Sequence, residues 1–100
     1  MSPRSDSARA RLLRLGFQDA GRAEAELARL GEPGESLVDL VARTADPDQA
    51  LAGLVRLHER AGADLLAGLR GDEPTALRLL SVLGASQALT DHLCRHPEQW

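Results

Sequence analysis

A short stretch near the C-terminal end of the sequence, HLCRH, gathers residue types that bind metal ions. It contains His92, Cys94 and His96. Zinc requires such ligands in a closed tetrahedral arrangement. On a helix, His92 and His96 share one face, whereas Cys94 points almost to the opposite side. We therefore interpret Cys94 as a semi-buried thiol between two partly exposed histidines, and a metal site is the disfavoured alternative.

Cys94 is also a candidate nucleophile. A reactive thiol needs a base within hydrogen-bond reach and electropositive surroundings, and adjacency in sequence supplies neither. The sequence has no glycine-rich phosphate loop, and no Gly-Ser followed by the Asp-x-Asp pair with which nucleotidyl transfer holds magnesium. We therefore assign no catalytic, cofactor-binding or metal-binding residue to any position.

The segment LLSVLGASQALTDHL has the spacing of a helix-turn-helix, with the turn at residues 84–86. A DNA-reading helix needs several Lys or Arg contacts to phosphate, but the second helix here offers one Arg against one Asp. We expect no nucleic-acid binding and interpret the segment as two helices packed across a tight turn. The side chains that the second helix would present are Gln87, Thr90, Asp91 and Arg95.

A cluster of arginines lies in the first helical stretch. We interpret it as the solvated face of an amphipathic helix, and the functional alternative is contact with an acidic partner surface. The cluster consists of Arg4, Arg9, Arg11 and Arg14. The residues expected on the buried side of the same helix are Leu12, Leu13 and Leu15.

The hydrophobic residues that must form the core are mostly Leu and Ala, with one Phe, one Trp and no Tyr. Leu and Ala favour helices, whereas the aromatic and β-branched residues that favour strands are scarce. The composition therefore predicts an all-α fold. We expect six or seven short amphipathic helices in a compact irregular bundle, a single helical region over residues 1–100.

The charge and the cysteine content restrict partners and location. A net charge of −3 gives no general attraction to nucleic acid or anionic lipid. A single cysteine indicates a reducing compartment. No apolar run approaches the roughly 20 residues that span a bilayer, and no apolar segment follows the N-terminal arginines as in a secretory signal. We therefore expect a cytoplasmic protein with no membrane partner.

Residues that start and end helices mark out the elements. The clearest start is DPDQ, where Asp46 is the cap, Pro47 is the first helical residue and Gln49 reaches back as in a capping box. Asp19 caps an earlier helix, between ends at Gly16 and Gly31. The other predicted signals are a cap at Ser5 or Ser7, a break at Pro33-Gly34, a start at Pro74 with an end before Gly84, and a helix from Ser86 to near Arg95.

The helical spacing also predicts which leucines carry the core. We expect Leu54, Leu80 and Leu89 to be the most sensitive to truncation. Losing one buried Leu to Ala should cost roughly 2–5 kcal/mol, a large share of a total stability of about 5–15 kcal/mol.

Three segments of the chain, in order, resemble the N-terminal start of the bifunctional glutamine synthetase adenylyltransferase/adenylyl-removing enzyme. The segments are RLGFQDAGRAEAELARLG, ADPDQALAGLVRLHE and LLSVLGASQALTDHLCRHPEQW. The last is the most specific, through the pattern LG-S--L-D-L-RHPE-W. The resemblance covers nearly the whole chain and is weakest at residues 1–10 and 31–35.

This resemblance implies a large cytoplasmic enzyme with two nucleotidyltransferase domains. In that family the C-terminal half attaches AMP from ATP to a tyrosine of glutamine synthetase, and the N-terminal half removes it by phosphorolysis. Both halves use magnesium, and PII signal proteins and glutamine bias the balance. The first helices precede the catalytic Gly-Ser and Asp-x-Asp residues. Residues 1–100 would then be an inactive helical support or partner surface of the adenylyl-removing half, with Mg²⁺ and ATP bound elsewhere.

The resemblance also concerns the last residues of the sequence. Trp100 would lie in the first turn of a helix that continues in the parent enzyme, and we expect a frayed end from His96 to Trp100 in the 100-residue chain. The alternative is a stand-alone small helical protein-interaction module whose likeness to the enzyme is only a shared Leu/Ala helix pattern.

Overall fold

The computed structural model describes residues 3–97, and within this range it contains seven helices and no strand. The all-α prediction is therefore confirmed. The helices are α1 (Pro3–Leu15), α2 (Ala20–Leu30), α3 (Glu32–Ala42), α4 (Pro47–Ala61), α5 (Ala63–Gly71), α6 (Glu73–Ala85) and α7 (Gln87–Arg95). None of these helices is both long and apolar enough to cross a membrane.

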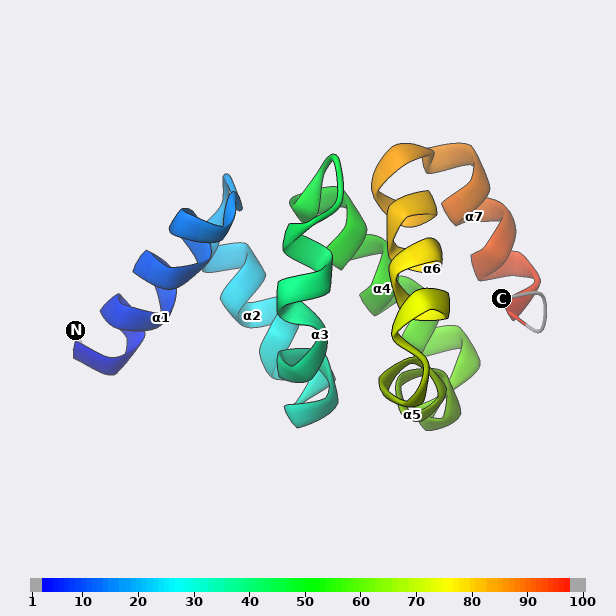
Figure 1. Ribbon diagram of the computed structural model, residues 1–100, viewed down its shortest axis with the longest axis horizontal. Helices are drawn as coiled ribbons and strands as arrows, with labels where there is room; N and C mark the ends of the chain where they lie inside the picture. The colour runs from blue at the N-terminus through cyan, green and yellow to red at the C-terminus, as the bar shows by residue number, and fades with distance from the viewer. Residues whose placement is uncertain (1–2, 98–100) are drawn as a thin grey trace.

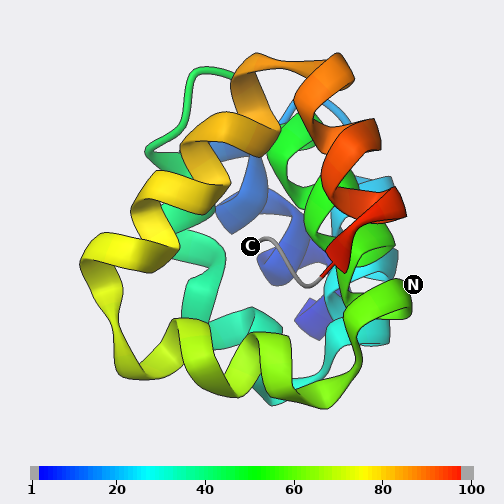
Figure 2. The same ribbon diagram turned by 90° about the vertical axis from the view of Figure 1, so that its right-hand side faces the viewer.

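The helices follow one another along a body of 40 × 23 × 22 Å (Figure 1). Helix α1 lies at one end and packs on α2, and α7 lies at the other end. The central helix is α4, which contacts α2, α3, α5, α6 and α7. Figure 2, viewed from the α7 end, shows α7 lying along α4. The radius of gyration of 12.8 Å is close to the roughly 13 Å expected for a compact chain of this length.

Side-chain caps begin several helices where the sequence predicts them. The carboxylate of Asp19 accepts from the Arg22 N–H at 3.0 Å, and that of Asp46 accepts from the Gln49 N–H at 3.1 Å. The Ser86 hydroxyl accepts from the Leu89 N–H at 3.1 Å. Each cap satisfies a backbone N–H that has no partner inside its helix.

Two glycines each end one helix and begin the next. Gly31 and Gly62 have φ of 76° and 86°, a conformation that only glycine adopts easily. Because each turn is made by one residue, α2 joins α3 and α4 joins α5 without a loop. These joints keep consecutive helices in contact.

Some predicted boundaries are wrong, and prolines explain most of them. Helix α3 begins at Glu32 and contains Pro33-Gly34, because a proline in the first turn has no N–H to lose from the helix. For the same reason α6 begins at Glu73, before Pro74, and α1 begins at Pro3, before the predicted caps. Helix α6 also continues through Gly84 to Ala85.

Every described helix contributes buried residues to the core. Two leucines that were predicted to be buried are not part of it. Leu54 and Leu80 are fully buried, as expected, whereas Leu89 is 51% exposed. Helix α7 instead turns Thr90 and Cys94 inward. In α1, Leu12 is buried and Leu15 packs against the core, but Leu13 is 57% exposed. The fully buried leucines are Leu51, Leu54, Leu57, Leu65, Leu69, Leu80 and Leu83.

A polar joint holds α4, α6 and α7 together at the end of α6. The Leu83 carbonyl accepts from the Gln49 side-chain amide at 3.1 Å and from the Thr90 hydroxyl at 3.3 Å. The Gln49 side chain makes this bond, and no bond from the Asp46 N–H to its oxygen is present, so the predicted capping box is not formed. A Cβ added to Gly53 would lie 3.1 Å from the Thr90 methyl and 3.3 Å from the Leu83 Cβ. A glycine at this position of α4 thus allows α6 and α7 to approach it.

Truncating two leucines tests the orientation of α7. Leu54→Ala should lower the free energy of unfolding by about 2–5 kcal/mol because it leaves a cavity. Leu89→Ala should change it by less than about 0.5 kcal/mol because this side chain is exposed. Urea denaturation of both variants measures the difference, and equal losses would show that α7 presents Leu89 to the core.

A pair of glycine substitutions tests the polar joint. Gly53→Ala should destabilise the chain by about 1–3 kcal/mol, because neither Thr90 nor Leu83 has room to move away. Gly71→Ala is the matched control, since nothing lies within 4 Å of the added methyl. It should stabilise the chain by about 0.4–1 kcal/mol by restricting the unfolded state. Thermal melts compare them, and a stabilised Gly53→Ala would mean that the helices do not meet at this residue.

Candidate functional site

The histidines and the cysteine of HLCRH do not come together as a metal site. Cys94 is a free thiol that is only 6% exposed, so it is more deeply buried than predicted. His92 and His96 are exposed on a shared face, with ring centroids 4.8 Å apart. Among the described residues, no group of three or more His, Cys, Asp or Glu side chains could hold a metal ion. The residues of this stretch are thus divided between core and surface.

The predicted helix-turn-helix residues are largely engaged within the chain. Thr90 is 2% exposed, and its hydroxyl donates to the Leu83 and Ser86 carbonyls. Asp91 accepts from Arg56 of α4 and, at 3.2 Å, from Gln87. Helices α6 and α7 pack on each other across the turn, as interpreted from the sequence.

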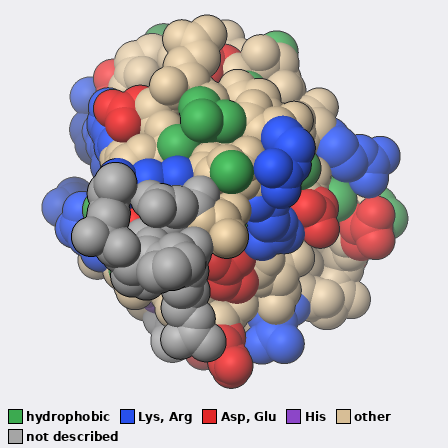
Figure 3. Space-filling view, turned by 90° about the vertical axis from the view of Figure 1, so that its left-hand side faces the viewer, with side chains coloured by type: hydrophobic (Ala, Val, Ile, Leu, Met, Phe, Trp, Pro, Cys, Tyr) green, Lys and Arg blue, Asp and Glu red, His purple; other side chains and the backbone are tan. Residues whose placement is uncertain are grey.

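The N-terminal arginines lie on an exposed face that is tied to its neighbours by ion pairs. Arg9 lies 3.5 Å from Glu24 of α2, and Arg11 lies 3.6 Å from Glu35 and 3.5 Å from Asp39 of α3. Figure 3, which faces the α1 end, shows basic and acidic side chains intermixed around a few hydrophobic ones. The side chain of Arg4 lies outside the described part of the structure.

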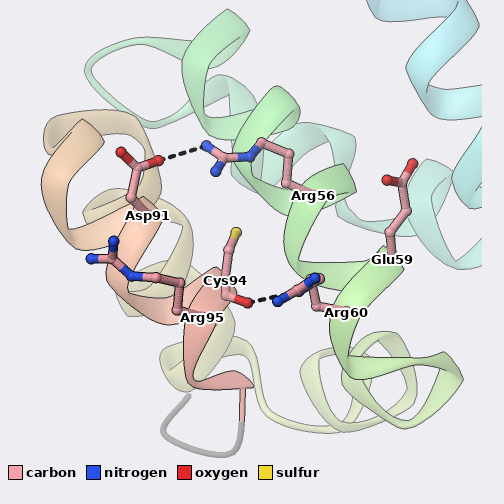
Figure 4. Close-up of a pocket in the computed structure, with 6 residues that line it drawn as sticks. All are labelled: Arg56, Glu59, Arg60, Asp91, Cys94 and Arg95. Carbon is pink, nitrogen blue, oxygen red and sulfur yellow. Dashed lines mark hydrogen bonds and ion pairs between the residues drawn. The ribbon is translucent and has the colours of Figure 1, made fainter.

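A groove between α4 and α7 brings charged side chains and a cysteine together. Its volume is about 450 Å³. Helical spacing puts its lining residues on one face of each helix, because positions three and four apart share a face. The lining residues are Arg56, Glu59 and Arg60 from α4, and Asp91, Cys94 and Arg95 from α7 (Figure 4).

The first contact across the groove is an ion pair. Arg56 Nη1 donates to Asp91 Oδ1 at 2.9 Å. This hydrogen bond, helped by the one from Gln87, lowers the pKa of Asp91 below its ordinary value of 3.8. The same bond raises the pKa of the Arg56 guanidinium. Both groups are therefore charged at neutral pH.

The second contact fixes one more arginine. Arg60 Nε donates at 3.0 Å to the Cys94 carbonyl, which lies in the last turn of α7. Carbonyls at a helix end have no partner within the helix, so this bond caps α7 from α4. Glu59 forms an ion pair with Arg29 of α2 and points away from Asp91 (Figure 4).

The groove places three guanidinium groups beside two carboxylates. Guanidinium groups present parallel N–H donors that match a carboxylate or phosphate. Asp91, Cys94 and Arg95 were expected from the sequence in other roles, whereas Arg56 and Arg60 were not predicted. The signal in the sequence that could have identified these two arginines is their spacing, which puts them on one face of a helix. The fold is all-α, and the groove between α4 and α7 gathers charged side chains from both helices.

The chain is similar to enzymes that carry one name, the bifunctional glutamine synthetase adenylyltransferase/adenylyl-removing enzyme. It is 49% identical to that of Streptomyces avermitilis over 97% of this chain, and 47% identical to that of Streptomyces coelicolor over all of it. It is 43% identical to that of Mycobacterium avium over 87% of this chain. The chain covers 11%, 11% and 10% of these three relatives.

These identities make the chain homologous to a segment of the bifunctional glutamine synthetase adenylyltransferase/adenylyl-removing enzymes, and the predicted resemblance is confirmed. The chain spans only about 11% of the length of the two Streptomyces relatives. No family model and no solved structure matches it.

The ion pair across the groove should give a defined pH dependence. Because the folded-state pKa of Asp91 is lowered, its contribution to stability is present above the unfolded value of 3.8 and is lost as the pH falls through the lowered value. Arg56→Gln should therefore lower the urea midpoint at neutral pH, and the difference from wild type should disappear in strong acid. Asp91→Asn serves as the control, since it should remove the same pH-dependent difference. A constant difference at all pH values would contradict this assignment.

Proposed function

We propose that the chain is a non-catalytic helical segment that supports an enzyme acting on glutamine synthetase. The observation that carries this proposal is the identity of 41–49% to enzymes of one name over most of the chain. In the proposed enzyme, AMP from ATP is attached to and removed from glutamine synthetase, the removal occurs by phosphorolysis, and magnesium serves both reactions. PII signal proteins regulate it in the cytoplasm.

The local chemistry of the chain is consistent with a supporting role. The described residues present a continuous core and a groove of arginines and carboxylates, which can bind but hold no metal cluster. The resemblance places the Gly-Ser and Asp-x-Asp residues of the family after this segment. We therefore propose that ATP and Mg²⁺ bind elsewhere in the enzyme and that these residues position or contact its adenylyl-removing half.

A second candidate, a stand-alone interaction module, is supported by the closure of the core. The described helices bury their leucines against one another, and Leu13 and Leu89 are the large hydrophobic residues that they leave exposed. A chain of this kind can fold without a neighbouring domain. Its function would then be to bind a partner through an outer face such as the α4/α7 groove.

A hybrid enzyme distinguishes the two candidates. In the Streptomyces avermitilis relative, the matching segment is replaced by this chain, and addition and release of AMP on glutamine synthetase are measured. The hybrid should keep both activities. An enzyme carrying an unrelated helical bundle of the same length should lose adenylyl removal by about a hundredfold, because misplacement far from the chemistry is costly.

The isolated chain provides the complementary measurement. Incubated with glutamine synthetase, ATP and Mg²⁺, it should leave the mass of glutamine synthetase unchanged. AMP transfer by the chain alone would contradict the supporting role, and a hybrid no better than the unrelated bundle would favour the interaction module.

A further inference from the structure

We propose that the groove between α4 and α7 binds an acidic segment from the rest of the enzyme polypeptide. This inference rests on the proposed function for the source of the segment. The residues that would hold it are Arg60 and Arg95, one from each of the two helices that line the groove. The acidic segment would supply Asp or Glu side chains to the two guanidinium groups.

Charge pairing inside the groove identifies these two arginines. Arg29 neutralises Glu59, and Arg56 neutralises Asp91. No carboxylate among the side chains that the structure describes, residues 7–62 and 64–97, forms an ion pair with Arg60 or Arg95. Two arginines without an ion-pair partner in this range thus line one groove, on a chain whose net charge is −3. The groove differs in sign from the molecule as a whole and complements an acidic ligand.

The groove is also preorganised for a carboxylate. The bond from Arg60 Nε to the Cys94 carbonyl fixes the guanidinium plane and leaves its terminal N–H groups for a ligand. Arg95 follows as the last residue of α7, and its side chain is exposed. Because the Arg60 side chain is already ordered, less conformational entropy is lost when a ligand binds.

The shape and lining of the groove favour a polypeptide over a compact anion. The groove extends along two neighbouring helices and is bordered by Glu59 and Asp91. An extended chain can place separate carboxylates beside the two arginines along this groove. The chain spans about 11% of its relatives, so most of such an enzyme lies outside it and can supply the segment.

The first experiment measures binding to the isolated chain at low salt. The probe is a short dye-labelled peptide of alternating Glu and Ser, and its Gln counterpart is the control. Wild type should bind only the Glu peptide. The double variant R60Q/R95Q should bind about five- to tenfold more weakly, as expected for two exposed charge pairs. The variant R14Q/R78Q changes net charge equally at exposed sites outside the groove and should bind like wild type.

Amide NMR shifts then locate the peptide. Shifts confined to α4 and α7 support the proposal. Shifts elsewhere, equal loss of binding in R14Q/R78Q, or equal shifts with inorganic phosphate alone would overturn it. Because Arg60 also caps α7, the single variant Arg95→Gln is measured as well, and it should weaken binding without changing the melting midpoint of the chain.

The second experiment tests the source of the acidic segment in the hybrid enzyme. Arg95→Gln should lower the melting midpoint of the hybrid, whereas it leaves the isolated chain unchanged. An unchanged hybrid would overturn docking within the enzyme even if the peptide binds. An active hybrid together with a chain that does not bind the peptide would overturn the groove assignment and leave the proposed function intact.

Discussion

The Leu83 carbonyl is a buried helix-end acceptor, and the arrangement of three helices depends on satisfying it. An unsatisfied buried acceptor costs about 1–3 kcal/mol. Gln49 of α4 and Thr90 of α7 both donate to this oxygen, so α6 ends at a point where the two neighbouring helices must meet. Gly53 makes the meeting possible because it has no Cβ to separate them. With α7 fixed beside α4, Arg56 and Arg60 reach Asp91 and the Cys94 carbonyl.

The local signals in the sequence predicted much of this fold, because helix starts and single-residue turns are local chemistry. Asp46 and Ser86 cap helices through atoms only three residues away. The rotation of α7 was not predicted. Both Leu89 and Thr90 lie on plausible inner faces by spacing, and hydropathy favours Leu89. Thr90 is buried instead because its hydroxyl bonds to carbonyls of its own helix turn and of α6, which removes the cost of burying it.

The groove could be predicted only in part, because it combines positions that lie far apart in the sequence. Arg56 and Arg60 are ordinary exposed arginines when α4 is considered alone. Their partners in α7 are 35 and 34 residues away, and no local pattern links them. The HLCRH stretch, considered for its metal-ligand residue types, contributes the Cys94 carbonyl and Arg95 to the groove rather than a metal site. The family was predicted from three segments that resemble it in order along the chain. The structure adds a charged groove that this resemblance did not predict.

Hydrogen–deuterium exchange tests directly whether the segment docks within a larger enzyme, as we propose. The same 100 residues are compared alone and within the hybrid enzyme. If the segment docks, amides near the groove, in the last turns of α4 and α7, exchange more slowly in the hybrid than in the isolated chain. Amides around Leu83 are equally protected in the two proteins. Identical exchange at every position would contradict docking and would mean that the chain is an independent bundle attached to the enzyme.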